Sequence, residues 1–297
     1  MDLGVVFPQL EIGTDPTAIR DFAQAAEGLG YSHLLIYDHV LGADRNRPGG
    51  WSGPYDKDSA FHEPFVLFGH LAAVTRTLEL VTTVLVLPQR QTALVAKQAA
   101  EVALLSGGRL RLGVGAGWNM VEFEALEQPF AGRGRRMEEQ IEVLRRLWAE
   151  DVVSFAGRWH RVSRAGINPR PRVPIPIWLG GTADPVLERA ARLADGWMAL
   201  LGPAQSREPI EKIRRHLVKY ARDPALFGIQ AQAQVATGDP DRWVKHAERW
   251  RELGATHLAV ATMGAGLRSP TEHIAAIRRY RDAVSGGIRH ARRLEAR

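Results

Sequence analysis

Short apolar runs alternate along the chain with segments whose apolar residues recur every three or four positions. The first run, residues 3–7, precedes Asp15-Pro16, which pairs a helix cap with a first-turn proline. Apolar residues then follow at helical spacing until Gly28-Leu29-Gly30 closes the segment. This order of strand and helix repeats, and it predicts eight strand–helix units before residue 285.

The eight predicted strands share a short apolar composition and span residues 3–7, 33–37, 78–86, 110–114, 175–179, 196–201, 229–235 and 257–261. The seven later helices are predicted at residues 63–75, 92–105, 134–148, 184–193, 206–220, 239–253 and 269–284.

Eight such units are typical of a (β/α)8 barrel, because helices supply the crossovers that parallel strands need. An open doubly wound sheet is the alternative. We expect one barrel domain over residues 1–285 and a basic tail over 286–297. Insertions are expected after the second strand, at 38–62, and before the fifth, at 149–174. The latter contains a candidate hairpin of 152–155 with 159–162 around Gly157.

Composition narrows the function classes. The chain has no cysteine, which excludes a disulfide framework, a thiolate nucleophile and a cysteine-ligated metal. Net charge is +6 with 34 Arg and 5 Lys, and the tail carries half of it, so we expect a solvated basic tail and no nucleic-acid partner. No apolar stretch approaches the roughly 18 residues of a membrane span, and no secretory signal is seen. We therefore expect a soluble cytoplasmic protein.

Barrel active sites lie at the carboxyl ends of the strands, which selects a few candidate positions. Asp38-His39 follows the second strand, and histidine suits proton transfer near neutral pH. Neighbouring strand residues point to opposite faces, so Asp38 and His39 need not touch.

Two glycine-rich turns also end strands. Gly113–Trp118 lacks the spacing of a dinucleotide-binding fingerprint, and Trp118 is either a stacking platform for a flat ring or a core residue. Gly180-Gly181-Thr182 precedes a helix, where backbone amides and the helix dipole favour an anion, although Asp184 at the cap would compete with it.

Other chemistries find little support. The sequence has neither H-E-x-x-H nor G-x-S-x-G, and we expect no metal site. Glu122, Glu124 and Glu127 are expected on a solvated face. Three arginines are expected to pair with Glu138 and Glu139 or to contact solvent: Arg133, Arg135 and Arg136.

Several motifs together resemble the luciferase-like monooxygenase superfamily. They are Leu87-Pro88-Gln89-Arg90, residues 96–100, 105–110 and 112–118, Pro174-Ile175-Pro176-Ile177-Trp178-Leu179-Gly180-Gly181, residues 190–197, Asp38-His39 and residues 122–126. The resemblance covers about residues 1–285, and the subgroup it resembles most is that of the coenzyme F420-dependent oxidoreductases.

The resemblance implies a barrel with coenzyme F420, or alternatively FMN, at the strands' carboxyl ends. It implies that Gly180, Gly181 and Thr182 hold the cofactor phosphate and that Thr83-Val84 forms a bulge behind the ring, with a non-proline cis peptide in deazaflavin relatives. His39 matches the histidine that faces the ring, and Asp38, Gly117 and Trp118 are further candidates for cofactor contact.

The sequence departs from the family pattern at two places. Trp118 stands where sugar-phosphate dehydrogenases of the family carry a carboxylate, which argues against sugar-phosphate oxidation. After the sixth strand, Leu200-Leu201-Gly202 offers the phosphate only backbone groups.

The main hypothesis is hydride transfer between coenzyme F420 and a small organic substrate, with His39 as the catalytic residue. Trp51, Tyr55, Phe61 and Trp118 favour an apolar or planar substrate, or else belong to the core. The alternatives are an FMN-dependent monooxygenase that uses reduced flavin and oxygen, and a cofactor-binding protein without turnover. A homodimer is expected by analogy with relatives.

Overall fold

Eight parallel strands close into a barrel in the computed structural model, which describes residues 1–295, with side chains as far as 286. The barrel strands, in chain order, are β1 (Asp2–Val6), β2 (His33–Ile36), β3 (Glu79–Thr82) with its continuation β4 (Leu85–Val86), β5 (Leu110–Gly115), β8 (Ile177–Gly180), β9 (Gly196–Met198), β10 (Gly228–Gln234) and β11 (His257–Ala261). Pairing of β1 with β11 and of β3 with β5 completes the ring. The predicted (β/α)8 barrel is confirmed, and the open sheet is excluded.

The predicted third strand differs from the expectation because it is interrupted. β3 ends at Thr82 and β4 begins at Leu85, and the peptide bond between Thr83 and Val84 is cis. β3 pairs with β2 and β5, whereas β4 pairs with β5 alone. The interruption lies at the place where the family resemblance implied a bulge.

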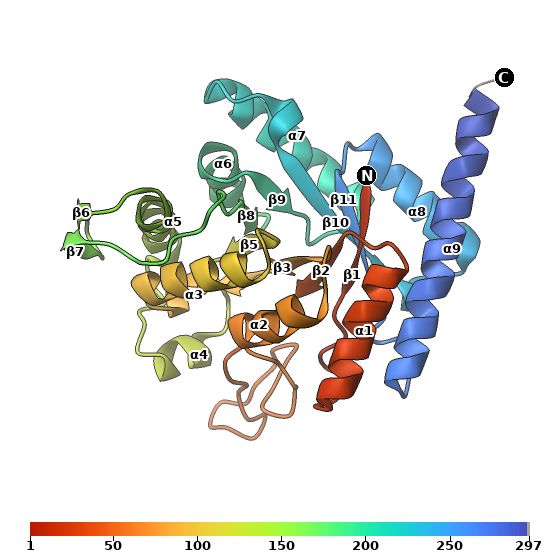
Figure 1. The fold of residues 1–297 in the computed structure, drawn as a ribbon, viewed down its shortest axis with the longest axis horizontal. Helices are drawn as coiled ribbons and strands as arrows, with labels where there is room; N and C mark the ends of the chain where they lie inside the picture. Colours follow the sequence, from red (N-terminus) through yellow and green to blue (C-terminus); the bar gives the residue numbers. More distant parts are fainter. Residues whose placement is uncertain (296–297) are drawn as a thin grey trace.

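Helices surround the barrel as the sequence predicted (Figure 1). They are α1 (Pro16–Gly28), α2 (Pro64–Val74), α3 (Thr92–Leu105), α5 (Arg133–Ala149), α6 (Asp184–Leu193), α7 (Pro203–Lys219), α8 (Pro240–Glu252) and α9 (Pro270–Glu295). Several begin with an acidic cap followed by proline; Asp15, for example, accepts a hydrogen bond from the Thr17 amide. α7 begins earlier than predicted, because Pro203 occupies its first turn.

Alternation along the strands creates two apolar layers. Leu34 and Ile36 of β2 belong to the large cluster between strands and helices, whereas Leu35 faces the barrel lumen with Trp178 and Met198. The lumen is therefore packed with side chains, and it forms a floor below the carboxyl ends of the strands.

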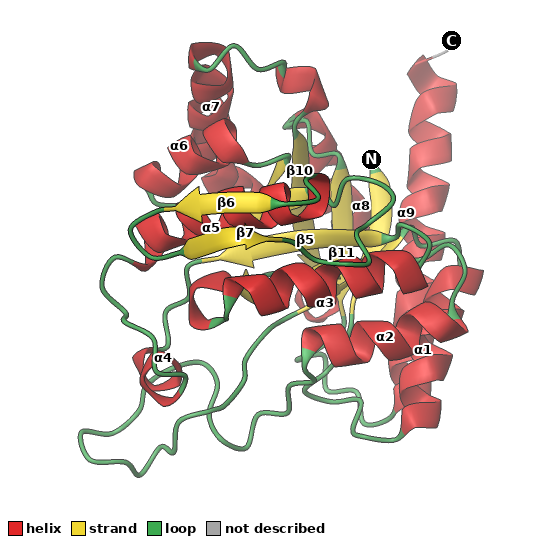
Figure 2. Cartoon of the chain, turned by 60° about the vertical axis from the view of Figure 1, so that its left-hand side comes forward, coloured by secondary structure: helices red, strands yellow, loops and turns green. Residues whose placement is uncertain are grey.

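Three features depart from the simple barrel (Figure 2). Residues 37–63 contain no helix or strand and form a long loop beside α2. The predicted hairpin is present as antiparallel β6 (Val153–Ala156) and β7 (Arg161–Ala165). A short helix that was not predicted, α4 (Met120–Ala125), follows β5 and starts at the Asn119 cap.

The last helix is longer than predicted. α9 continues to Glu295, so it crosses position 286, where a separate tail was expected to begin; residues 296–297 lie outside the described part of the chain. Within the described residues, no helix is both long enough and apolar enough to span a membrane.

Candidate active site

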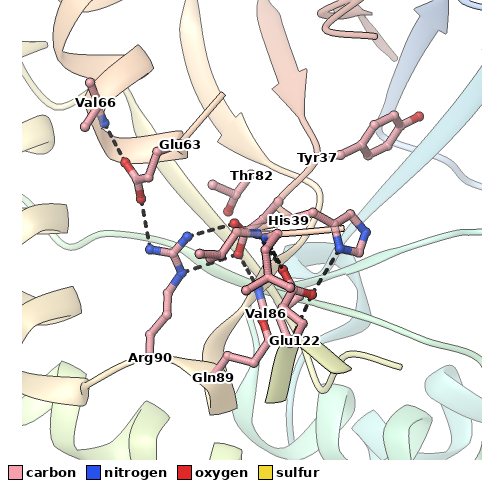
Figure 3. Close-up of polar contacts among 12 residues, drawn as sticks. Tyr37, His39, Glu63, Val66, Thr82, Val86, Gln89, Arg90 and Glu122 are labelled. Atoms are coloured by element: carbon pink, nitrogen blue, oxygen red, sulfur yellow. Dashed lines mark hydrogen bonds and ion pairs between the residues drawn. The ribbon is translucent and has the colours of Figure 1, made fainter. Parts of the chain in front are cut away.

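The two polar residues that follow β2 bind different partners: Asp38 binds Val86 and Arg90, whereas His39 points to Glu122 (Figure 3). Asp38 is buried, and its Oδ2 accepts a hydrogen bond of 2.9 Å from the amide of Val86, while its Oδ1 lies 2.7 Å from Nη2 of Arg90. Asp38 thereby ties the end of β2 to β4. The structure gives it this bracing task, and its contact with a cofactor stays a prediction.

Arg90 extends the brace. Its Nη1 donates to Oε1 of Glu63 at 2.9 Å, and the other carboxylate oxygen of Glu63 caps α2 by accepting from the amide of Val66 at 2.8 Å. Glu63 is thus the N-cap of α2. Arg90 therefore connects β2, β4 and α2 on one side of His39, a task that sequence reasoning did not assign to it.

His39 is held by a fully buried carboxylate. Its Nδ1 lies 3.1 Å from Oε2 of Glu122, which also accepts from Nε2 of Gln89 at 3.1 Å. The other oxygen, Oε1, accepts from the Val40 amide at 2.5 Å. A carboxylate can only accept here, so Nδ1 of His39 carries the proton and Nε2 is left on the far side of the ring.

The placement of Glu122 corrects the expectation of a solvated face. Glu122 points into the protein from α4, whereas its neighbours Glu124 and Glu127 are exposed as predicted. Burial by itself raises the pKa of Glu122, but hydrogen bonds from His39, Val40 and Gln89 outweigh it, and the pKa lies below its ordinary value. Glu122 is therefore a carboxylate at neutral pH.

The interruption of the third strand places Val84 above the lumen. A Cβ built on Gly180 would lie 2.7 Å from Cγ1 of Val84, and one built on Gly115 would meet the same side chain. Glycine at both positions allows the close approach. Thr83, Val84, Gly115 and Gly180 thus form one cradle at the carboxyl ends of β3, β5 and β8.

Gly117 and Trp118 continue this rim. Gly117 has a positive φ of 73°, and a Cβ there would meet Val86 and Phe123. Nε of Arg133 donates to the Gly117 carbonyl at 3.1 Å. The expected pairing of the three arginines with Glu138 and Glu139 is wrong, because these carboxylates bind Arg189, Arg192 and His160. The alternative, contact with solvent, holds for the exposed Arg135.

Aromatic rings surround His39 from the inserted loop and from the turn after β5. The ring centroids of Tyr55, Phe61 and Trp118 lie 5.2, 4.8 and 5.6 Å from that of His39. Trp51 stacks on Trp118 at 5.8 Å. The four aromatics named from the sequence therefore meet at one place, and they give the imidazole an apolar wall.

The glycine pair after β8 leads to an uncapped helix. Gly181 has a φ of 126°, and its carbonyl accepts from Nε1 of Trp197 at 2.8 Å. The N-cap of α6 is Ala183, without a side-chain cap, while Asp184 is bound by Lys212 at 2.7 Å. The expectation that Asp184 competes with an anion for the helix amides is therefore wrong. The exposed Thr182 lies beside these amides.

Two buried side-chain oxygens near the carboxyl ends of the strands have no hydrogen-bond partner among the described residues. They are Oγ1 of Thr83, a residue after β3, and Oε1 of Gln9, a residue after β1. Such atoms are rare in native proteins unless a ligand or water completes them. With the glycine cradle, they make the rim suitable for a flat, phosphate-bearing cofactor.

Within the described residues, no group of three or more His, Asp or Glu side chains is placed to hold a metal.

Comparisons with known proteins agree with this geometry. An uncharacterized protein of Mycobacterium tuberculosis is 42% identical over 197 residues, or 65% of this chain and 68% of the relative. An F420-dependent glucose-6-phosphate dehydrogenase of Intrasporangium calvum is 29% identical over 84% of this chain and 90% of its own.

Among solved structures, an F420-dependent secondary alcohol dehydrogenase in complex with an F420-acetone adduct superposes with a TM-score of 0.78. The match covers 95% of this chain and 98% of the other at 17% identity, which shows a shared fold. The family model described as luciferase-like monooxygenase matches residues 1–294. The chain therefore belongs to the luciferase-like monooxygenase family.

Proposed function

We propose that the protein is a coenzyme F420-dependent oxidoreductase that transfers hydride between the deazaflavin and a small organic substrate. The observation that carries the proposal is the His39–Glu122 pair, which shares the carboxyl rim of the barrel with the glycine cradle. The F420-dependent relative, which aligns over 84% of the chain, supports this cofactor.

The chain's own groups divide the remaining work. When bound, the deazaflavin supplies or accepts the hydride. Gly180, Gly181 and Thr182 would hold its phosphate, with the uncapped start of α6 adding a favourable dipole, and Val84 would support its ring.

His39 would hold or move the coupled proton at Nε2. Glu122 fixes the tautomer, because it accepts the hydrogen bond that Nδ1 of His39 donates. Arg90 and Asp38 keep the strand end that carries His39 in place. His39 would thus transfer the proton at Nε2, while the hydrogen bond from Nδ1 to Glu122 sets the orientation of the ring.

The aromatic wall favours a substrate with an apolar or planar body. Trp118 and Trp51 stack, and Tyr55 and Phe61 line the other edges of His39. A sugar phosphate would find no cationic partner among these rings, so we propose a neutral organic substrate with an oxygen within reach of Nε2.

A titration of the purified protein with F420 and with FMN, followed by fluorescence, tests the cofactor. We expect binding of F420 in preference to FMN. Binding of FMN without F420 would favour an FMN-dependent monooxygenase, which the family description also allows.

The catalytic role is tested by His39→Ala. We expect F420 binding to persist and turnover with the deazaflavin to fall by roughly 10²–10⁴-fold, the usual contribution of a general acid or base. Unchanged turnover of His39→Ala would overturn the catalytic role of His39. Absence of turnover from the wild type across a panel of carbonyl and enone substrates would leave a cofactor-binding protein instead.

Assembly and location belong to the same proposal. We propose a homodimer in the cytoplasm, by analogy with relatives. Light scattering of the purified protein measures its mass, and a monomer would contradict the first part.

A further inference from the structure

Tyr55 lies beside His39 on the long loop between β2 and α2. The centroid of its ring is 5.2 Å from that of His39 and 4.9 Å from that of Phe61, which itself lies 4.8 Å from the imidazole. Of the four aromatic residues that form the wall around His39, Tyr55 is the one that carries a hydroxyl group. A hydrogen-bonding group is therefore attached to an otherwise apolar wall, next to the imidazole.

Contacts within the loop hold Tyr55 in place. Its carbonyl accepts a hydrogen bond of 2.6 Å from Nε1 of Trp51, and Trp51 stacks on Trp118 with ring centroids 5.8 Å apart. The amide of Lys57 donates to the carbonyl of Ala43 at 3.0 Å and closes the loop. The backbone of Tyr55 is therefore fixed against the rim of the barrel, as a group that meets a substrate oxygen requires.

The hydroxyl of Tyr55 is both unpaired and accessible. Three of the five tyrosines have hydroxyls that donate to protein oxygens: Tyr31 to the carbonyl of Ile277, Tyr37 to Gln232 and Tyr220 to Glu188. The hydroxyl of Tyr280 has no partner within the described chain and is enclosed by protein. That of Tyr55 also forms no hydrogen bond within the described residues, but it is not enclosed, and the residue is only partly buried. A ligand can therefore reach it and complete its hydrogen bond.

An electrostatic interaction with Tyr37 shows on which side of the loop the phenol of Tyr55 lies. Tyr37 packs against the apolar cluster of the lumen, and its hydroxyl donates to Oε1 of Gln232 on β10 at 3.3 Å. Burial raises the pKa of Tyr37, and the charge that Tyr55 would carry raises it further, so the two phenols are near each other. Tyr55 therefore lies between the imidazole of His39 and the lumen-facing Tyr37.

The chemistry of Tyr55 complements that of His39. Because Nδ1 of His39 donates to Glu122, Nε2 is an acceptor whenever the imidazole is neutral, and it donates only in the imidazolium form. Burial raises the pKa of Tyr55, so its phenol is protonated at neutral pH and remains a donor. A neutral O–H group that is already in position stabilises negative charge on a substrate oxygen, above all in an apolar site.

We propose that Tyr55 is a second catalytic residue, which donates a hydrogen bond to the same substrate oxygen that exchanges a proton with Nε2 of His39. This inference rests on the proposed function. In the direction of reduction, the carbonyl carbon accepts the hydride from the reduced deazaflavin, and the electron pair of the C=O double bond moves to the oxygen. This oxygen takes a proton from Nε2 of protonated His39, while Tyr55 stabilises its charge and keeps its own proton. Oxidation of the alcohol is the same step in reverse.

The test compares Tyr55→Phe with the matched control Tyr220→Phe, because each substitution removes one phenol oxygen. α7 starts after the carboxyl end of β9 and ends at Tyr220, far from the rim, where the hydroxyl of Tyr220 binds Glu188 at 2.8 Å. F420 affinity is measured by fluorescence. The values of kcat and KM are measured with F420 and the carbonyl or enone substrate that the wild type turns over fastest.

We expect Tyr55→Phe to lower kcat by about 10²-fold, the usual loss on removing one donor to an oxyanion, and to keep the F420 affinity. Tyr220→Phe should keep both. The thermal unfolding midpoint of Tyr55→Phe should equal that of the wild type, since the lost oxygen has no partner within the described chain. If both groups act on one oxygen, the double variant His39→Ala with Tyr55→Phe loses much less than the product of the two single losses.

Equal kcat values of Tyr55→Phe and the wild type would overturn the catalytic role of Tyr55 and leave the proposed function standing. A double variant whose loss equals the product of the single losses would also overturn the inference, because the two groups would then act independently. Absence of F420-dependent turnover from the wild type would instead overturn the proposed function together with this inference.

Discussion

Glu122 has a different role in the folded protein from the one that its local sequence predicts. Asn119 and Glu122 have the spacing of a capping box, in which the glutamate would turn back to its own helix terminus. In the structure Asn119 caps the helix, but Glu122 turns to the loop after β2 and accepts from His39 and Val40, which are 83 and 82 positions away in sequence. Of the two hydrogen bonds of a capping box, the one to the Asn119 side chain forms, whereas Glu122 makes tertiary contacts instead of the other.

We expect Glu122→Gln to lower kcat by about tenfold or more and to leave F420 affinity nearly unchanged. The amide keeps the volume but has only one accepting atom, whereas both oxygens of Glu122 accept, from His39, Val40 and Gln89. Glu124→Gln, an exposed change on the same helix, is the control. Equal effects of the two substitutions would contradict a positioning role for Glu122.

At the scale of elements, one carboxylate attaches the β6–β7 hairpin to the barrel. Glu139 on α5 accepts from the amides of Arg158, Trp159 and His160 at 2.9, 2.8 and 2.6 Å. It also pairs with Nδ1 of His160 at 2.8 Å, and Nε2 of His160 lies 2.7 Å from Oγ1 of Thr92. These bonds outweigh the effect of burial and hold the pKa of Glu139 below its ordinary value.

Replacing Glu139 by Gln turns one acceptor into a donor that faces backbone N–H groups. We expect a loss of about 1–3 kcal/mol in unfolding free energy, the usual cost of an unsatisfied group. Limited proteolysis should also cut residues 150–176 faster. Glu142→Gln, an exposed position of the same helix, should change neither measurement; equal cleavage of both variants would remove the proposed attachment.

At the scale of the whole molecule, the amino-terminal end of the barrel lumen holds a buried basic cluster. The guanidinium of Arg111 lies 4.3 Å from the Trp178 ring and binds Glu79 at 2.6 Å, and the His33 and His257 rings are 5.3 Å apart. Burial, and then the charge of Arg111, lower the pKa of both histidines, that of His257 to about 3. Both are neutral in the folded protein at neutral pH.

This cluster predicts acid sensitivity. The unfolded chain takes up a proton at each histidine near pH 6.5, whereas the folded chain does not, so stability falls as pH decreases below 6.5. Between pH 7.5 and 5.0 we expect His257 to contribute about 2 kcal/mol to the loss. In urea unfolding, His257→Gln should reduce the loss by that amount, and His70→Gln, an exposed position on α2, should not. A loss as large in His257→Gln as in the wild type would contradict the assignment.

The sequence by itself determined the barrel, because strand and helix follow from local periodicity and from caps such as Asp15-Pro16. It also located His39, the glycine turns and the hairpin, since strand ends are readable from a strand's own residues. The short helix α4 escaped prediction, since six residues give too little periodicity.

Only the tertiary structure decided which side chains meet. Glu122 with His39, Arg90 with Asp38, and Val84 against Gly115 and Gly180 are contacts between segments that closure of the barrel brings together. Local preferences determine the elements, whereas the partners of a buried charge depend on the geometry of the closed sheet, which no short segment encodes.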